Sequence, residues 1–324
     1  MFRAALISAA LLTALTLPSA ASAQGPAQGS LSLSVQRDYG YRGQQIALSG
    51  QTLRLKGVVT PYVAGEQVAV RIALPGGAFT ARRTLVQQGS RGVFFVNFRA
   101  RRTGRITVTA TKDATPALGA LSGTAKPVTV IGTRAGGGAS GLRVRFLQQR
   151  LQALRYLIDP SGSYDAGTQR AVLAFRKVNR MARITTADER IFTLLARYQG
   201  AFQAKHPNHG KHVETDLQRQ VLALVNPGGK VFKVLHTATG KASTPTVVGG
   251  FRFYRKDFGT NSLGMVHSSY FIGGYAIHGY SSVPTAPASH GCLRIPISNA
   301  RFVFRWIGIG DRIDVYLRGG RTRY

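Results

Sequence analysis

The sequence predicts a mainly β protein with one small α domain between two β-rich regions. Over residues 30–131 and again over 211–318, apolar and polar residues alternate in short segments, as they do in half-buried strands. Over residues 142–202 the apolar spacing changes to three and four residues, which is typical of amphipathic helices. A chain of 324 residues is long enough for two or three such domains.

Residues 1–23 are typical of a signal peptide. A short positive start is followed by the apolar run "AALISAALLTALTL", which is too short to cross a bilayer, and Ala21 and Ala23 suit cleavage before Gln24. The alternative is an uncleaved N-terminal anchor. Either way, we expect the rest of the chain to be secreted or to lie in the cell envelope, in the wall or periplasm.

Residues 30–131 predict an immunoglobulin-like β-sandwich. The segments "LSLSV", "TLRLKGVV", "QVAVRIAL", "VFFVNF" and "RITVTAT" alternate, and turn residues such as Pro61 and Gly104 separate them. The region has no candidate catalytic cluster, so we interpret it as a spacer or binding module. The glycine-rich stretch 132–141 that follows is expected to be a flexible linker.

Three helices are expected over residues 142–202. The first lies within "LRVRFLQQRLQALRYL", and Asp165 can cap the second. Thr186 and Glu189 have the spacing of a capping box at the start of the third.

A histidine-rich stretch, "QAKHPNHGKHVETD", follows the helices. His206, His209 and His212 could suggest a metal site, but Pro207 and Gly210 break any helix that would align them. We therefore expect an exposed linker loop.

The last region, 211–318, is expected to be a second β domain. "VETDLQRQVLALV" and "KVFKVLHTA" flank the turn "NPGG" as in a hairpin. The segments "GGFRFYRK", "SSYFIGGYAIHG" and "RIDVYL" supply further strands, and "SNARFVFRWIG" predicts a helix.

The charge balance concerns partners rather than fold. Lys and Arg number 43 and Asp and Glu 12, a formal net charge of +31. For an exported chain this favours anionic wall polymers, lipid head groups or peptide carboxylates over nucleic acid. A merely basic solvated surface is the alternative.

The only cysteine, Cys292, is the strongest chemical signal. An exported chain with one cysteine cannot form an internal disulfide, which leaves a reactive thiol, an inert buried residue or an intermolecular link. His278 lies 14 residues before it, and His290 and Arg294 lie two residues to either side. Such neighbours favour a thiolate nucleophile. Gly291 allows a sharp turn that could point the amides of Gly291 and Cys292 at one oxyanion.

The histidine base needs an orienting acceptor, and no acidic residue occurs between Asp257 and Asp311. The backbone carbonyl of Gly279 is the economical substitute. A zinc site built from His278, His290 and Cys292 lacks a fourth ligand. A buried structural cysteine fits poorly with these polar, cationic neighbours. The residues alone thus predict a cysteine nucleophile acting on an acyl group.

The stretches "IHG" and "SHGCLRI" resemble the signature of L,D-transpeptidases with a YkuD-type catalytic domain. "LQQRLQALRYL" and "GSYDAGTQRAVLAFRK" likewise resemble the peptidoglycan-binding helical domain of wall enzymes, with Arg176 where that domain usually has glutamine. The first resemblance implies that Cys292 is the nucleophile, His278 the general base and Gly279 its orienter. His290 and Gly291 would shape the motif loop. Arg294 would contact substrate, with Ser289 and Tyr270 as further candidates.

The implied reaction is 3→3 cross-linking of peptidoglycan stem peptides through a thioester on Cys292, with release of D-alanine and no metal or other cofactor. Carbapenem-type β-lactams would be inhibitors because they acylate the thiol. Two alternatives stay open. Water could resolve the thioester, which would make the protein an L,D-carboxypeptidase, or the chain could be a non-catalytic wall-binding protein.

Overall fold

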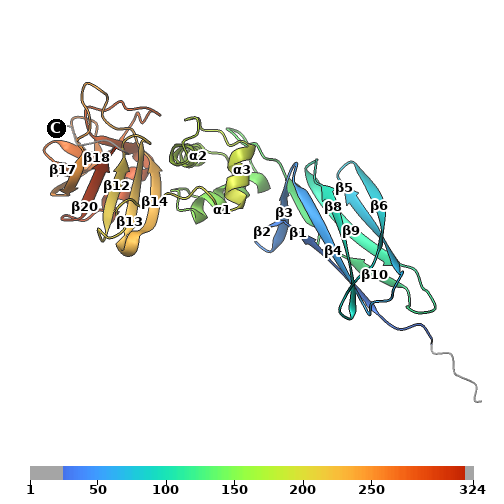
Figure 1. The fold of residues 1–324 in the computed structure, drawn as a ribbon. Helices are drawn as coiled ribbons and strands as arrows, with labels where there is room; N and C mark the ends of the chain where they lie inside the picture. Colours follow the sequence, from blue (N-terminus) through green and yellow to red (C-terminus); the bar gives the residue numbers. More distant parts are fainter. Residues whose placement is uncertain (1–24, 318–324) are drawn as a thin grey trace, which may run out of the picture.

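The computed structural model describes residues 25–317, so the predicted signal peptide over residues 1–23 lies outside the described residues. Figure 1 shows three units in a row: a β-sandwich, a helical unit in the middle and a β-rich catalytic unit. This arrangement confirms the predicted fold class, mainly β with a small α domain. None of the helices within residues 25–317 has the length and apolarity needed to cross a membrane.

The N-terminal unit is a sandwich of two sheets. Their inner faces share one core, in which Leu53 and Leu55 of one sheet meet Val68, Val70 and Ile72 of the other. The first sheet has the order β1 (Ser30–Gln36), β4 (Thr52–Thr60), β8 (Arg91–Arg99), β7 (Val86–Gln88). The second has the order β2 (Tyr39–Tyr41), β3 (Gln44–Leu48), β11 (Val128–Ile131), β9 (Gly104–Lys112), β5 (Gln67–Leu74), β6 (Gly77–Thr84), with β10 (Leu121–Thr124) also paired to β9.

The helical unit contains α1 (Leu142–Ala153), α2 (Ala166–Val178) and α3 (Glu189–Ala196). Asp165 caps α2, as expected, by accepting the Thr168 amide at 2.7 Å. The expected capping box of α3 is wrong, because Asp188 is the N-cap and accepts the Ile191 amide at 3.1 Å.

Both Arg176 and the stretch 132–141 form hydrogen bonds within the helical unit. The Arg176 guanidinium is buried and bonds Asp188 at 2.7 Å and the Thr186 carbonyl at 2.8 Å, so it ties α2 to the start of α3. The stretch 132–141, expected to be flexible, pairs with the helical unit at Ala135 and Ser140.

The catalytic unit has two sheets and one helix, α4 (Ile297–Trp306), around a common core. The five-stranded sheet has the order β14 (Lys230–His236), β13 (Val221–Asn226), β12 (His212–Asp216), β20 (Arg312–Tyr316), β15 (Gly249–Arg252). A short 3₁₀ turn, η1 (Pro227–Gly229), joins β13 to β14. The four-stranded sheet has the order β16 (Arg255–Thr260), β17 (Val266–Ile272), β18 (Tyr275–Tyr280), β19 (Leu293–Pro296).

Two expected strands are each divided. "VETDLQRQVLALV" forms both β12 and β13, because Asp216 accepts the Arg219 amide and Gln220 adopts a φ of 57°, which makes a turn without glycine or proline. "GGFRFYRK" contributes β15 to one sheet and the start of β16 to the other.

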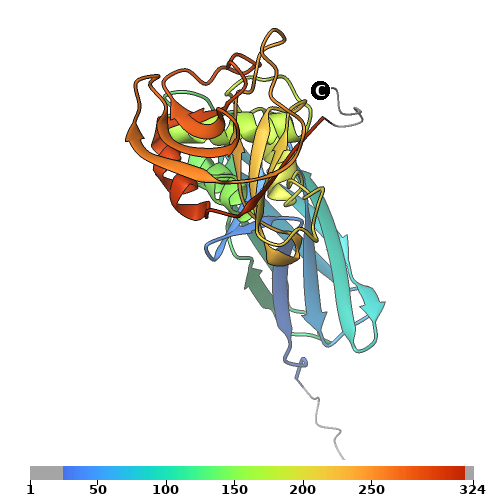
Figure 2. The same ribbon diagram turned by 90° about the vertical axis from the view of Figure 1, so that its left-hand side faces the viewer.

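The helical unit is packed onto its neighbours on both sides. One apolar cluster joins its helices to Ile46 and Leu48 of the sandwich and to Val221 and Val234 of the catalytic unit. The Leu157 amide also donates to the Val234 carbonyl of β14 at 2.9 Å, and the Val234 amide donates to the Arg155 carbonyl at 2.9 Å. Seen from the catalytic end, the green and yellow helices lie directly behind the orange and red sheets (Figure 2).

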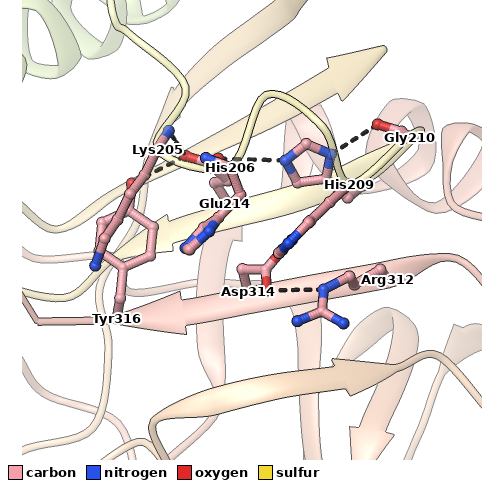
Figure 3. A network of polar contacts seen from close by, with 9 residues as sticks. Lys205, His206, His209, Gly210, Glu214, Arg312, Asp314 and Tyr316 are labelled. Carbon is pink, nitrogen blue, oxygen red and sulfur yellow. Dashed lines mark hydrogen bonds and ion pairs between the residues drawn. The ribbon is translucent and has the colours of Figure 1, made fainter. Parts of the chain in front are cut away.

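The histidine-rich stretch is not a free linker loop. His212 is fully buried at the start of β12, and His209 Nδ1 lies 2.9 Å from Asp314 of β20. Glu214 is fully buried beneath the loop, where its carboxylate accepts the amides of Lys205 and His206 at 2.8 and 2.6 Å (Figure 3). It also accepts the Tyr316 hydroxyl at 3.0 Å. Within residues 25–317, no group of three His, Cys, Asp or Glu side chains is arranged to hold a metal ion.

We expect Glu214→Gln to lower the free energy of unfolding by about 2–3 kcal/mol, because bonds to a buried charged acceptor would become bonds to a neutral one. Chemical denaturation of the full chain measures this. Glu189→Gln, at an exposed carboxylate on α3, should change the same quantity by less than about 1 kcal/mol. Equal effects of the two substitutions would contradict a structural role for Glu214.

Candidate active site

The pairing of β18 with β19 brings the predicted catalytic residues onto one face. These strands are parallel, with Ile277 opposite Leu293 and His278 opposite Arg294. Ile277 and Leu293 both point into the core of the unit. Because side chains alternate along a strand, His278 and Arg294 lie on the other face, and Cys292, just before β19, shares that face.

His278 is held as a neutral, oriented imidazole. Its ring is 3% exposed, and its Nδ1 lies 2.9 Å from the carbonyl oxygen of Gly279. Since a carbonyl only accepts, Nδ1 carries the hydrogen and Nε2 carries the lone pair. Burial lowers the pKa of His278 below its ordinary value, with a further contribution from Arg294, while the Gly279 bond opposes the shift.

The thiol of Cys292 is half-buried beside Met265, Tyr270 and Ala276. Its Sγ lies 3.5 Å from the carbonyl oxygen of Gly274, which it can reach as a weak donor. Burial raises the pKa of Cys292 above its ordinary value, and the Ala276 amide and Arg294 oppose this. At neutral pH the site therefore pairs a neutral thiol with a neutral imidazole.

The turn before Cys292 requires glycine at position 291. Gly291 has a φ of 117°, and a Cβ there would lie 2.3 Å from the Tyr275 ring. Its amide donates to Ser289 Oγ at 3.1 Å, and that hydroxyl donates to the Cys292 carbonyl at 2.6 Å. The Gly291 amide is therefore bonded within the turn. We expected the amides of both Gly291 and Cys292 to donate to an oxyanion, and of these two only the Cys292 amide remains for that role.

The remaining predicted residues differ in exposure. Ser289 is 1% exposed and its hydroxyl supports the turn, so a contact with substrate stays a prediction. Tyr270 is also buried, under the Arg255 guanidinium at 3.9 Å from the ring centre, and packs beside Cys292. His290 is exposed. Arg294 is half-buried and stacks on the Tyr280 ring at 4.1 Å.

Sequence reasoning assigned no role to the segment 237–246, which forms hydrogen bonds to the turn before Cys292 and to Arg294. Thr246 Oγ1 donates to the Gly291 carbonyl at 2.7 Å, and Thr237 Oγ1 donates to the Arg294 carbonyl at 2.7 Å. Ala238 also exchanges backbone bonds with Arg294. The run of threonines in "TATGKASTPT" is the one signal that could have indicated this, because buried hydroxyls need partners.

The loop between His278 and Cys292 is also held from the helical unit. Lys177 Nζ of α2 is buried and lies 2.7 Å from His236 Nδ1. His236 Nε2 donates to the Val283 carbonyl at 2.9 Å. Arg183 donates to the Thr285 carbonyl at 3.0 Å. Burial lowers the pKa of Lys177 to about 6 and that of His236 to about 4, so this contact between the units does not depend on a buried charge at neutral pH.

The structure thus places a buried, carbonyl-oriented imidazole on the same sheet face as the only cysteine of the sequence. The family model of the L,D-transpeptidase catalytic domain, YkuD, matches residues 210–315, and that of a peptidoglycan binding domain matches residues 140–185. An L,D-transpeptidase from Xylanimonas cellulosilytica is 33% identical. The alignment covers 57% of this chain and 98% of that one, with a TM-score of 0.53. The chain belongs to the L,D-transpeptidase family.

Two further solved structures were matched. An L,D-transpeptidase from Stackebrandtia nassauensis is 22% identical over 58% of this chain and 98% of that one, with a TM-score of 0.36. The L,D-transpeptidase LdtMt1, solved in complex with imipenem, is 13% identical over 89% of this chain and 99% of that one, with a TM-score of 0.29. Because both TM-scores are below 0.5, these two structures add nothing to the family assignment. No curated protein sequence matches the chain.

We expect alkylation of Cys292 by iodoacetamide to be slow at neutral pH and to rise through a pKa above that of an ordinary cysteine, because burial favours the neutral thiol. Arg294→Gln should move this profile to still higher pH, since Arg294 favours the thiolate. Rates measured by intact mass against pH check both shifts. A rate that already reaches its plateau below pH 8 would mean a resting thiolate and contradict this electrostatic account.

Proposed function

We propose that this protein cross-links peptidoglycan as a 3→3 L,D-transpeptidase, with Cys292 as nucleophile and His278 as general base. The observation that carries the proposal is the contact between His278 Nδ1 and the Gly279 carbonyl at 2.9 Å. It leaves Nε2 free to accept a proton on the sheet face shared with Cys292.

In the first half-reaction, Nε2 of His278 takes the proton of the thiol as Sγ attacks the carbonyl carbon of the third residue of a tetrapeptide stem. The bond to the terminal D-alanine nitrogen then breaks, and His278 returns the proton to that amine. The Cys292 amide supports the oxyanion. The product is a thioester, which retains the acyl group in activated form.

In the second half-reaction, the side-chain amine of another stem's third residue attacks the thioester. His278 takes a proton from this amine and returns it to the departing sulfur, which restores the thiol. If water attacks instead, the same site acts as an L,D-carboxypeptidase. An exclusively wall-binding role is disfavoured because the chain retains both Cys292 and His278, on one sheet face.

We expect incubation with a disaccharide-tetrapeptide to release D-alanine and add the acyl group to Cys292, as measured by intact mass. With an amine acceptor present, a cross-linked dimer should form. Cys292→Ala should fold and give no adduct. Dimer formation identifies the transferase, free tripeptide alone identifies the carboxypeptidase, and no adduct on the wild-type chain contradicts both enzymatic functions.

His278→Gln should slow acylation about 10²- to 10⁴-fold at neutral pH, because a positioned base is lost. In the wild type, acylation should rise with pH through a pKa below that of an ordinary histidine, since burial lowers the pKa of His278 and only the neutral ring accepts a proton. His290→Gln, at the exposed histidine of the motif, is the matched control and should retain this profile. A carbapenem-type β-lactam is a convenient second acyl donor.

The sandwich adds a partner to this proposal, an anionic wall polymer. A cavity of about 560 Å³ at one end of the sandwich is lined by Arg99, Arg101, Arg102 and Phe79, and none of its lining residues is acidic. Three guanidinium groups beside an aromatic ring suit a phosphodiester polymer. Peptidoglycan-acting domains imply a location in the cell envelope, where such polymers occur.

We expect the triple variant Arg99→Gln, Arg101→Gln, Arg102→Gln to bind synthetic poly(glycerol phosphate) at least about tenfold more weakly at low salt. Replacing Arg42, Arg91 and Arg105 with glutamine removes the same charge elsewhere on the sandwich and should have a smaller effect. Equal losses of polymer binding by the two triple variants in a co-sedimentation assay would indicate that binding depends on net charge alone, and would contradict a binding site in the cavity.

A further inference from the structure

A second cavity, of about 540 Å³, lies between the helical unit and the catalytic unit. One wall is a single stripe of α2 that contains Gln169, Arg170 and Leu173. The opposite wall is formed by Tyr280, by the loop residues Val283 and Thr285, and by the start of α4. We call this the interdomain groove.

The groove is built into the structure by contacts below its walls. His236 donates to the Val283 carbonyl and is itself bonded to Lys177 of α2. Arg183 donates to the Thr285 carbonyl from the other side. Both units thus fix the loop that forms the outer wall, and a ligand would not have to order it.

Arg170 is the charged group of the groove, and none of the residues that line the groove is acidic. Among residues 25–317, its guanidinium forms a single hydrogen bond, from Nη2 to Ser298 Oγ at 3.1 Å, and no ion pair. Its Nε has no partner. The acid nearest in sequence, Asp165, already caps α2 and accepts from Ser161. A planar cation with unused donors is suited to a carboxylate.

Tyr280 connects the groove to the catalytic face. Its ring lines the groove, stacks under the Arg294 guanidinium at 4.1 Å and meets the His278 ring edge-on at 5.6 Å. The groove therefore lies on the His278 side of the site. In the proposed reaction this is the side from which the second amine must approach, because His278 takes its proton.

We propose that the interdomain groove binds the acceptor stem peptide, with Arg170 holding the carboxylate of that stem. This inference rests on the proposed transpeptidase function and adds the acceptor's position to it. An acceptor tetrapeptide ends in a free carboxylate one residue beyond the third-residue side chain that supplies the amine. Held at Arg170, that stem would present its amine past Tyr280 toward the thioester.

The test compares two acceptors that differ in one group, a tetrapeptide with a C-terminal carboxylate and the same peptide as its C-terminal amide. The thioester is preformed with the donor, and the KM for each acceptor is measured from dimer formation. The wild type should favour the carboxylate about 10- to 100-fold in KM, the usual worth of a charge-assisted contact. In Arg170→Met this preference should disappear, and in Arg170→Lys it should be partly retained.

The controls separate binding from folding and from the proposed function. Arg190→Met, on the exposed surface of α3, and Ser298→Ala, which removes the hydrogen bond from Arg170 Nη2 but keeps the guanidinium, should both keep the preference for the carboxylate. Acylation by the donor should be unchanged in Arg170→Met, which also shows that the variant is folded. An Arg170→Met protein that keeps the preference, or that slows donor acylation as much as aminolysis, overturns the inference. A wild type that forms no dimer overturns the proposed function instead.

Discussion

The parallel register of β18 and β19 is the constraint on which the site depends. It sets His278 beside Arg294 and directs Ile277 and Leu293 into the core. A shift of one residue in this strand pairing would turn the sheet face that carries the His278 imidazole toward the core. Gly279 contributes twice. Its carbonyl orients His278, and its lack of a side chain lets α4 approach, since a Cβ there would lie 2.6 Å from that of Ala300. The helix that covers the sheet and the acceptor that orients the base therefore depend on the same residue.

The electrostatics of the site follow from burial more than from charge pairing. The chain carries a net charge of +31, yet a carbonyl orients His278 and Arg294 is the cation that acts on both reacting groups. Desolvation raises the pKa of the thiol and lowers that of the imidazole, so the resting pair is neutral. In the proposed reaction, charge would develop only as the proton moves to His278 during attack. The thiol would then react weakly with small electrophiles, while a positioned acyl group could still be attacked.

The sequence predicts the parts of this fold that depend on local patterns. Alternation predicts the sandwich strands, Asp165 predicts the start of α2, and both are confirmed, while the residues around His278 and Cys292 predict a candidate site. It does not reveal contacts whose partners are distant along the chain. Glu214 gives no sign that it will receive the amides of Lys205 and His206, and the turn at Gln220 has no glycine or proline to mark it. Ser289 is polar and next to the motif, which favours a substrate role, but its burial is decided by the fold.

The helical unit is part of the active-site architecture as well as a neighbour of it. Residues 221–225 of β13 are all apolar, because one face of the strand packs on the catalytic core and the other on the helices. Two residues of the helical unit help to fix the loop between His278 and Cys292. Lys177 bonds to His236, which donates to the Val283 carbonyl of the loop, and Arg183 donates to the Thr285 carbonyl. A ligand bound to α2 would consequently touch an element that the catalytic loop also touches. The helical unit and the loop between His278 and Cys292 therefore share one boundary, and a substitution of Lys177 or Arg183 should loosen that loop even though both residues lie outside the sheets that carry His278 and Cys292.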